Sequence, residues 1–422
     1  MATDRNKPPC QRADALAVAS RLTASGHVAY FAGGCVRDTL LGLQPADYDV
    51  ATDAPPDRVR KLFPNTQAVG AAFGVILVRQ GRSVVEVATF RTDGVYSDGR
   101  HPDKVRFASA EEDAQRRDFT INGLFLDPVK DQVIDYVGGQ ADLTARRLRA
   151  IGEPAKRFEE DHLRLLRGVR FAARFDLQIE PATAAAIRHA APRLKGISPE
   201  RIAEELRLML TPVTRQRAWP LLWDLELMPV IFRMLTIAAG PRRPLFEQLV
   251  VGEPISFGLA LAAAALEVTG KTQLERSETR GAVAAIRKSL RISNEESEAM
   301  QGILESLPPL LATGEPTLAM KKRFLALPAS SDARMLLAAL AAIGAFVERA
   351  KSLADEFALL EKTDFAPSPL LTGDDLTAAG MTPGPAFKRI LDAVYDEQLE
   401  GRILTKETGL NAAARLAKEN SP

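Results

Sequence analysis

The hydrophobic pattern of this 422-residue sequence changes once, near Lys156, and this change constrains the fold more than any other feature. Before it, short apolar runs such as GVILVRQ and SVVEVATF alternate with turn residues, which is typical of β-strands. After it, apolar residues recur at helical spacing, as in SPERIAEELRLML, where Ser198 and Pro199 suit a helix start. The sequence therefore predicts an α+β protein, with a small mixed β-sheet first and an all-helical remainder.

Composition places the chain among ordinary globular proteins, with 46% hydrophobic and 26% charged residues and a length that suits two or three structural units. The net charge of +1 indicates no class of partner. Residues 143–174, however, hold nine Lys or Arg against four Asp or Glu. Such a patch either binds polyphosphate or nucleic acid, or forms a solvated helix face.

Cysteine content and apolar runs predict the compartment. Cys10 and Cys35 form neither a metal-ligand spacing nor a disulfide framework, which favours a reducing environment. We expect Cys35 to be a small buried side chain rather than a nucleophile. The longest apolar run, FGLALAAAALEV, is too short to span a membrane, and the first residues lack an apolar signal core. The sequence predicts a cytoplasmic protein with no membrane partner, and leaves its oligomeric state open.

Two carboxylates stand one residue apart in DYDVAT, at Asp47 and Asp49. On a β-strand this spacing points both side chains to one face. Like charges held together repel, and divalent cations such as Mg²⁺, which prefer oxygen ligands, relieve that repulsion. The alternative is a solvated acidic turn.

A third carboxylate, Glu86, lies within the apolar run SVVEVATF, where strand alternation puts it on one face with Val84 and Ala88. A carboxylate at such a position is costly unless it is paired or binds a metal ion. Together with Asp47 and Asp49 it would complete a two-metal site for in-line phosphoryl transfer. The alternative is a salt bridge to Arg91 or Arg37.

A glycine turn at Gly33 and Gly34 precedes a helix, VRDTLLG, that ends at Gly42. Glycines permit a tight turn and a close approach to a ligand, and Arg37 on the first helical turn could reach a phosphate. The stretch matches neither a P-loop nor a dinucleotide fingerprint. Ordinary turn chemistry is the alternative.

Four stretches, in this order, resemble the motifs of the class II tRNA nucleotidyltransferase and bacterial poly(A) polymerase family: GGCVRDTLLGLQPADYDVAT, EVATFRTDGVYSDGRHP, RRDFTINGLFLD and RFEEDHLRLLRGVRFAARF. The likeness covers about residues 28–210, and the segment LLTGDDLTAAGMTPGPAFKRILDAVYDEQLEGRI resembles the family's C-terminal segment. It implies an elongated molecule with a nucleotidyltransferase head over 1–145, a helical neck over 146–215, a helical body over 216–360 and a helical tail over 361–422. It also implies addition of C and A, as CCA, to the 3′ end of tRNA from CTP and ATP, with Mg²⁺ and release of pyrophosphate.

The resemblance assigns roles to individual residues. Asp47 and Asp49 match the metal-binding pair, and Glu86 matches the third carboxylate. The positions that match nucleotide-binding residues of the head are Gly33, Gly34, Arg37, Arg117, Asp118 and Asn122. Arg117 and Asp118 belong to the segment that senses the ribose 2′-hydroxyl. Taken alone, the Arg-Arg-Asp run is equally typical of a charged helix start.

Base selection falls to a Glu-Asp-x-x-Arg motif in that family, matched here by Glu160, Asp161 and Arg164. We predict one helix from residue 157 to 175, on which Asp161, Arg164, Arg167 and Arg170 advance in steps of three along one side. Arg167 and Arg170 would face the triphosphate or a stacked base. The alternative is a wet helix face with ion pairs three residues apart.

Hydrogen-bond chemistry supports that role. Asp161 only accepts and Arg164 only donates, whereas cytosine and adenine both present an amine beside a bare ring nitrogen. Uracil and guanine present the reverse pattern, and each buried mismatch costs on the order of 1–3 kcal/mol. The pair therefore suits C and A and rejects U and G.

Two stretches bear on which family member this is. Poly(A) polymerases typically carry a Gly-Arg-Arg-Phe-like stretch, and the matching residues 70–73 here read GAAF. Residues 92–106 resemble the flexible loop linked to the switch from C to A, which argues against a CC-only enzyme. A poly(A) polymerase, an adenosine-only enzyme and an inactive RNA-binding relative remain open. No His-Asp pair occurs, so we expect no phosphohydrolase domain, and the later helices would hold the tRNA acceptor arm.

Overall fold

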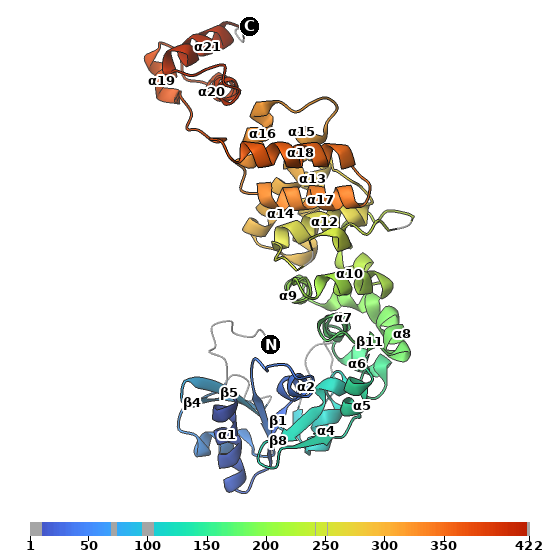
Figure 1. Cartoon of the computed structure of the whole chain (residues 1–422). Helices are drawn as coiled ribbons and strands as arrows, with labels where there is room; N and C mark the ends of the chain where they lie inside the picture. Colours follow the sequence, from blue (N-terminus) through green and yellow to red (C-terminus); the bar gives the residue numbers. More distant parts are fainter. Residues whose placement is uncertain (1–10, 69–73, 95–104, 241, 251, 420–422) are drawn as a thin grey trace. The chain divides into compact units, whose positions relative to one another are not determined.

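A computed structural model of the chain describes residues 11–68, 74–94, 105–240, 242–250 and 252–419. The chain divides into two compact units, residues 1–210 with 217–231, and residues 211–216 with 232–422. The first unit contains a β-sheet and the helices that follow it, and the second unit is helical (Figure 1). The predicted α+β class is confirmed.

The main sheet of the first unit has the strand order β3-β4-β5-β2-β1-β8-β9. Its strands are β1 (Ala29–Ala32), β2 (Asp49–Thr52), β3 (Thr66–Ala68), β4 (Val75–Gln80), β5 (Ser83–Thr89), β8 (Leu124–Asp127) and β9 (Gln132–Asp135). Neighbours pair antiparallel except β2 and β5, which run parallel, so the sheet is mixed as predicted. Gly81, with a left-handed φ of +59°, lies in the turn of the β4–β5 hairpin.

One face of this sheet packs on α1 (Arg12–Ala24) and α3 (Pro56–Leu62) (Figure 1). Strand β5 explains which face the helices cover. Val85 and Val87 are buried on the helix side, whereas Glu86 on the opposite face is half-buried. On the helix side, Val18 and Leu22 of α1 are fully buried. The alternation predicted for β5 is therefore present.

The opposite face of the sheet is covered by a helix over one part and lines cavities over the rest. Helix α4 (Ala110–Gln115) contributes Ala110 and Ala114 to a core that includes Phe90 and Phe125, over the β1–β8 part of the sheet. The ring centroids of Phe90 and Phe125 lie 5.7 Å apart in an edge-on arrangement. The β2–β5–β4 part of the same face is left to line two cavities.

Short elements complete the chain up to residue 231. They are α2 (Gly34–Leu40), β6 (Arg91–Asp93) paired with β7 (Val105–Phe107), η2 (Thr120–Asn122), α5 (Gly139–Thr144), β10 (Arg147–Leu148) paired with β11 (Gln178–Ile179), α8 (Pro181–Ala190), η3 (Ala191–Gly196), α9 (Pro199–Met209), α10 (Arg215–Asp224) and α11 (Met228–Ile231). Helix α9 begins at Pro199 after Ser198, as predicted.

The prediction of one helix over residues 157–175 is wrong. The structure has α6 (Pro154–Glu160) and α7 (Arg164–Arg174), separated at Asp161, where the backbone is extended. The Asp161 carboxylate accepts a hydrogen bond from the amide of Leu163 at 2.9 Å. Short acidic side chains offer the backbone this local alternative to helix, which explains the break.

The second unit is built from η4 (Phe246–Gln248), α12 (Phe257–Thr269), α13 (Arg276–Leu290), α14 (Asn294–Ser306), α15 (Pro308–Leu311), α16 (Leu318–Leu325), α17 (Ser330–Ala342), α18 (Val347–Leu360), α19 (Gly373–Ala378), α20 (Ala386–Leu399) and α21 (Lys406–Glu419). Helix α12 is its central element, since every residue from Gly258 to Val268 is buried. It packs on α14, where a Cβ added to Gly258 would lie 2.7 Å from the Cβ of Ala299.

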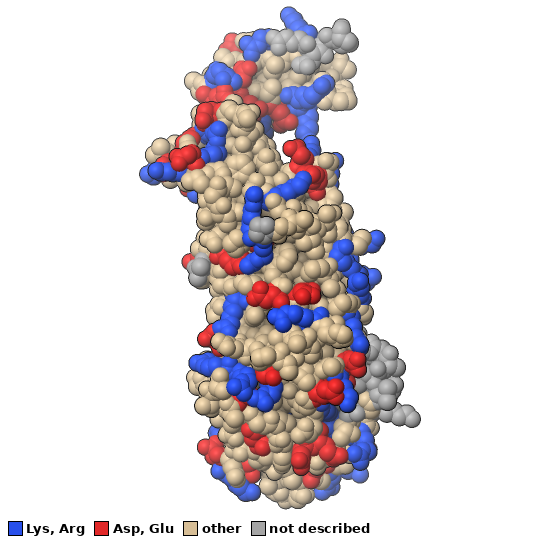
Figure 2. Space-filling view, turned by 90° about the vertical axis from the view of Figure 1, so that its right-hand side faces the viewer, with Lys and Arg blue, Asp and Glu red and all other residues tan. Residues whose placement is uncertain are grey.

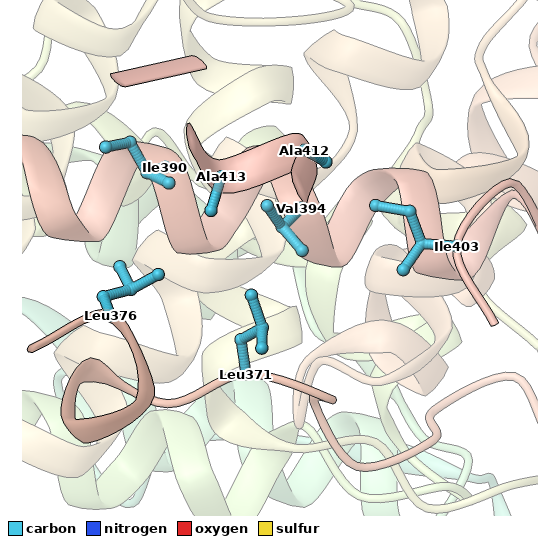
Figure 3. Packing of buried hydrophobic residues seen from close by; sticks show 7 residues of the cluster. All are labelled: Leu371, Leu376, Ile390, Val394, Ile403, Ala412 and Ala413. Carbon is cyan, nitrogen blue, oxygen red and sulfur yellow. The ribbon is translucent and has the colours of Figure 1, made fainter. Parts of the chain in front are cut away.

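The last helices have a hydrophobic cluster of their own. Leu371, Leu376, Ile390 and Val394 meet residues of α21 there (Figure 3). In the described residues no single helix is long and apolar enough to cross a bilayer, although α16 and α17, bent by 112°, pass that length and composition test as a pair. Positive and negative side chains are interspersed over the face shown in Figure 2.

Candidate active site

A cavity of about 510 Å³ opens on the sheet face opposite α1 and α3. Its walls come from β1, β2 and β5, from the turn after β1, from residues 116–122 and from α7. The predicted site residues that line it are Gly33, Gly34, Arg37, Asp49, Glu86, Arg117, Asp118, Asn122, Asp161, Arg164 and Arg167. The first unit therefore brings residues far apart in the sequence to one cavity.

Asp49 and Glu86 lie side by side on this face. Val50 of β2 pairs with Val87 of β5 in parallel register, so Asp49 and Glu86 each precede that pair by one residue. Both line the cavity, Asp49 exposed and Glu86 half-buried. The parallel register of β2 and β5 thus places two carboxylates next to each other.

Asp47, the other acid of the predicted pair, lies outside both the strand and the cavity lining. Strand β2 begins at Asp49, so the expectation that both acids belong to the strand is wrong for Asp47. It is exposed in the loop before β2 and does not line the cavity. Within the part of the chain that the structure describes, no three His, Cys, Asp or Glu side chains gather closely enough to hold a metal ion.

The donor set of the cavity nonetheless fits a magnesium ion. Mg²⁺ is commonly held by one or two carboxylates, with substrate phosphates and water completing its octahedron, rather than by a protein cage. Asp49 and Glu86 supply two carboxylates at the wall of a cavity whose other walls carry Arg117, Arg164 and Arg167. Such a cavity is suited to an anionic ligand that brings the remaining oxygens itself.

The glycine turn is required by the backbone conformation at Gly33, and a close contact adds to this requirement. Gly33 has φ +68°, and a Cβ there would lie 2.9 Å from Nη1 of Arg117. Its amide donates to the carbonyl of Leu124 at 3.0 Å, which fixes the turn to β8. Gly34 is less constrained, because its added Cβ would make an ordinary 3.6 Å contact with Arg37. The first glycine of the pair is therefore the one that the backbone demands.

A buried polar network lies beneath the cavity. The guanidinium of Arg37 donates from Nε and Nη2 to Asp38, at 2.8 and 2.6 Å, and from Nη1 to the side-chain oxygen of Asn122 at 2.5 Å. Asn122 donates in turn to Asp118 at 2.9 Å, and Asp118 accepts two bonds from Arg167, at 2.8 and 2.6 Å. The network ties α2, η2 and α7 together.

The charges of this network have shifted pKa values. Burial acts to raise the pKa of Asp118, but the facing Arg167, the hydrogen bond from Asn122 and the nearby Arg164 outweigh it and hold that pKa well below its usual range. Burial lowers the pKa of Arg37, against the opposing effect of Asp38. Arg37 also lies over the ring of Phe175, with its Cζ 4.1 Å from the centroid. Its donors are thus engaged by protein groups.

Asp113 is a residue of the site that the sequence analysis missed. It is 2% exposed, and its two carboxylate oxygens accept from Arg116 at 2.7 and 2.9 Å and from Arg117 at 3.0 and 3.1 Å. Burial acts to raise its pKa, and the two arginines bring the pKa below its usual range. The spacing in EEDAQRRD, three and four residues on a helix, is a pattern that could have revealed this pairing.

Asp161 lies in the break between α6 and α7, and Arg164 is the first residue of α7. Arg164 is 8% exposed and donates to Glu160 at 2.6 Å and to the carbonyls of Arg157 and Arg116 at 2.9 and 3.2 Å. One Asp161 oxygen accepts from Leu163, and the other lies 4.0 Å from Arg201. Arg164 is therefore held in a fixed orientation at the cavity wall.

Known proteins match this chain along most of its length. The family model of the poly(A) polymerase head domain matches residues 29–149, and a model described as a probable RNA and SrmB binding site of polymerase A matches residues 176–238. The crystal structure of the Bacillus stearothermophilus CCA-adding enzyme in complex with CTP is 30% identical, with a TM-score of 0.67, and 97% of each chain is covered.

The chain belongs to the CCA-adding enzyme and bacterial poly(A) polymerase family.

Curated members of the family match over about half of their length. The CCA-adding enzyme of Enterococcus faecalis is 46% identical over 209 residues, 49% of this chain and 51% of that protein. Poly(A) polymerase I of Salmonella typhi is 43% identical over 234 residues, 53% of this chain and 50% of that protein. The matched stretch thus spans about half the length of these curated relatives.

One predicted site residue, Arg170, and the cysteine expected to be buried need separate mention. Arg170 does not line the cavity, and its Nε lies 3.2 Å from a carboxylate oxygen of Glu205 on α9. Cys35 is buried, as expected, and burial raises the pKa of its thiol to about 12. The stretch at residues 70–73 and most of the loop at 92–106 lie outside the described residues.

Proposed function

We propose that this chain adds C, C and A in turn to the 3′ end of tRNA, with CTP and ATP as substrates. The tRNA 3′-hydroxyl attacks the α-phosphate of the nucleotide, the bond from that phosphorus to the bridging oxygen breaks, and pyrophosphate leaves. Because its substrate is tRNA, we place the reaction in the cytoplasm. The solved relative that is 30% identical holds CTP, which supports a nucleotide substrate.

One observation supports this proposal above the others. The same cavity contains Asp49 and Glu86 on one wall and Asp161 and Arg164 on another. The first pair offers carboxylates beside the reacting phosphate, and the second offers an acceptor and a donor for a base edge. A single nucleotide in a cavity of about 510 Å³ can contact both.

The metal that we propose is Mg²⁺, held by Asp49 and Glu86, with Asp47 as a further ligand that would have to approach from its loop. When bound there, Mg²⁺ neutralises the triphosphate and lowers the pKa of the attacking hydroxyl. On the nucleotide side, Gly33 and Gly34 allow close approach to phosphate, and Arg117 and Arg167 supply positive charge. Arg37, Asp118 and Asn122 orient these groups through the buried network.

Base selection is proposed for Asp161 and Arg164. Arg164 is oriented by Glu160 and by two backbone carbonyls, so its remaining N–H groups point in fixed directions. Cytosine and adenine present an amine donor and a bare nitrogen acceptor to this pair, whereas uracil and guanine present the reverse. We propose that Arg170 acts indirectly, because it packs on the ring of Phe171, which Arg167 also contacts.

A poly(A) polymerase is the second candidate, favoured by the 43% identity to the Salmonella typhi enzyme. An adenosine-only enzyme and a non-catalytic RNA-binding relative are the others. The last of these is disfavoured by Asp49 and Glu86, which stand side by side at the cavity.

One assay separates all four. The full chain is incubated with Mg²⁺, labelled CTP or ATP, and tRNA that lacks its terminus or ends in CC. Addition of two C and one A, followed by arrest, supports the proposal. Unlimited A indicates a poly(A) polymerase, A added only to a CC end indicates the partial enzyme, and no incorporation with retained tRNA binding indicates the non-catalytic relative.

A further inference from the structure

A second hollow, of about 390 Å³, lies on the same sheet face as the active-site cavity. Strands β3, β4 and β5 form it, through Gln67, Leu77, Arg79 and Val84, together with Asn65 just before β3. Leu77 pairs with Glu86, and Arg79 pairs with Val84. Because directly paired residues project from the same face, the hollow and the carboxylates share that face.

The Leu77–Glu86 pair separates the two hollows along β4 and β5. On one side of it the active-site cavity is lined by Val75 and Ala88, and on the other side the second hollow is lined by Arg79 and Val84. Glu86 therefore stands between two binding spaces on one continuous surface.

If the transfer is in line, the incoming nucleotide and the attacking RNA strand must occupy different spaces. The attacking and leaving oxygens lie roughly on a line through the phosphorus. The proposed nucleotide-binding groups come from the β1 side of the sheet, from the turn at Gly33, from Arg117 and from α7. The leaving pyrophosphate belongs on that side, so the attacking hydroxyl approaches from the β4–β3 side, where the second hollow lies.

The chemistry of the second hollow suits a phosphate. The Arg79 side chain is exposed and makes no hydrogen bond or ion pair with any residue that the structure describes. The amides of Asn65 and Gln67 add neutral donors, and the backbone N–H of Arg79 donates to the carbonyl of Asn65 at 2.9 Å, which fixes this loop to β4. Arg79 lies two residues beyond Leu77, roughly 7 Å along the strand and on the scale of one nucleotide.

We propose that the second hollow binds the last phosphodiester of the RNA strand whose 3′-hydroxyl attacks, with the Arg79 guanidinium donating to a phosphate oxygen. This inference rests on the proposed function. It makes Arg79 a positioning residue for the primer strand, distinct from the residues that bind the incoming nucleotide.

The test is a steady-state comparison of the wild-type chain with Arg79→Ala, Arg79→Lys and the matched control Arg82→Ala. Arg82 is an exposed arginine of the same hairpin that does not line the hollow. Loss of one charge-assisted hydrogen bond raises KM for tRNA by about tenfold in Arg79→Ala. KM for CTP stays constant, Arg79→Lys recovers part of the loss, and Arg82→Ala behaves as wild type.

A chemical substitution in the RNA sharpens the test. A tRNA whose last phosphodiester is an uncharged methylphosphonate loses about tenfold in kcat/KM with the wild-type chain. With Arg79→Ala it loses nothing further, because the partner of the charge is already gone. When the methylphosphonate is placed several nucleotides upstream instead, Arg79→Ala still lowers kcat/KM to the full extent seen with unmodified tRNA.

The outcomes separate this inference from the proposed function. If the wild-type chain incorporates no nucleotide, the proposed function fails. If the wild type is active and Arg79→Ala leaves KM for tRNA unchanged, or raises KM for CTP instead, the second hollow is not the primer site. Equal losses from methylphosphonates at both positions also overturn the assignment.

Discussion

The first unit buries a network of charges around its cavity, whereas the second buries mainly alanine and leucine, with single buried charges such as Glu267, which pairs with Arg242. Around the cavity, Arg37, Asp38, Asp113 and Asp118 are each at most 7% exposed and engage one another or a neighbouring arginine. In the second unit, the helix α12 packs on α14 through small apolar side chains. Apolar packing tolerates exchanges of similar volume, whereas a buried network loses its function when one partner goes. The comparison indicates that the buried charged groups around the cavity serve to position side chains, whereas the apolar core of the second unit serves stability.

The largest expected effect comes from removing a carboxylate of the cavity. Asp49→Asn should reduce incorporation by at least about a thousandfold, since charge stabilisation by a bound metal is worth several kcal/mol. Asp49 is exposed, so the free energy of unfolding and tRNA binding should stay constant. The measurements are labelled-CTP incorporation and thermal unfolding, with Asp57→Asn, an exposed acid of α3, as the matched control. Activity retained at ordinary Mg²⁺ would contradict the metal assignment.

Breaking the buried network should cost stability as well as activity. Asp118→Ala leaves Arg167 without its carboxylate, and because the Arg167 side chain is 33% exposed, we expect a loss of about 1–3 kcal/mol in the free energy of unfolding, less than for a fully buried charge. Denaturant unfolding measures this loss, and Glu111→Ala on α4, whose side chain is exposed, is the control.

The pH dependence has a definite sign. The folded-state pKa of Asp118 lies below its unfolded value of about 3.9, so its stabilising effect is complete above the unfolded pKa and is lost as the pH falls from there through the folded-state pKa. Wild type should lose stability below about pH 4, and Asp118→Ala should lose less over the same range. Equal acid sensitivity in both proteins would count against the pairing.

The next effect concerns selectivity rather than rate. Asp161→Ala removes the acceptor that we propose rejects the uracil carbonyl, so UTP incorporation relative to CTP should rise by about thirtyfold, or about 2 kcal/mol. Competition between labelled UTP and CTP measures the ratio. The exposed carboxylate of Glu159, which pairs with Arg193, provides the control Glu159→Ala. Complete exclusion of UTP by Asp161→Ala would refute the base-reading role.

The smallest effect tests the apolar unit. Gly258→Ala places a Cβ 2.7 Å from Ala299 and 3.1 Å from the amide of Met300, and should destabilise the protein by about 1–3 kcal/mol. Gly281→Ala on α13 meets open space and should stabilise it by about 0.5–1 kcal/mol. Thermal unfolding compares the two, and a Gly258→Ala protein as stable as wild type would show that α12 can shift.

Local patterns predicted much of the fold and part of the site. Strand alternation placed Glu86 on the face opposite Val85 and Val87, because alternation depends only on neighbours in sequence. The parallel register that sets Asp49 beside Glu86 is a long-range property, which the family resemblance implied and periodicity alone could not.

Other features depend on hydrogen bonds and long-range pairings, which hydrophobic periodicity does not reveal. Residues 157–175 have helical spacing throughout, yet the Asp161 carboxylate captures the amide of Leu163 and ends the first helix. The partner of Asp118 is Arg167, 49 residues later, and no local pattern pairs them. For Asp47 the strand boundary fell two residues later than the sequence indicated.

The joint at Asp161 has a consequence for how base choice could be altered. A continuous helix would rotate every downstream side chain by about 100° if one residue were inserted. Here α6 and α7 are separate segments with their own buried contacts, through Phe158 on one and Leu165 and Leu166 on the other. An insertion between positions 161 and 163 should therefore change the orientation of Asp161 relative to Arg164 while leaving both segments folded. If these two residues select the base as proposed, this short linker is the place to engineer a different nucleotide preference.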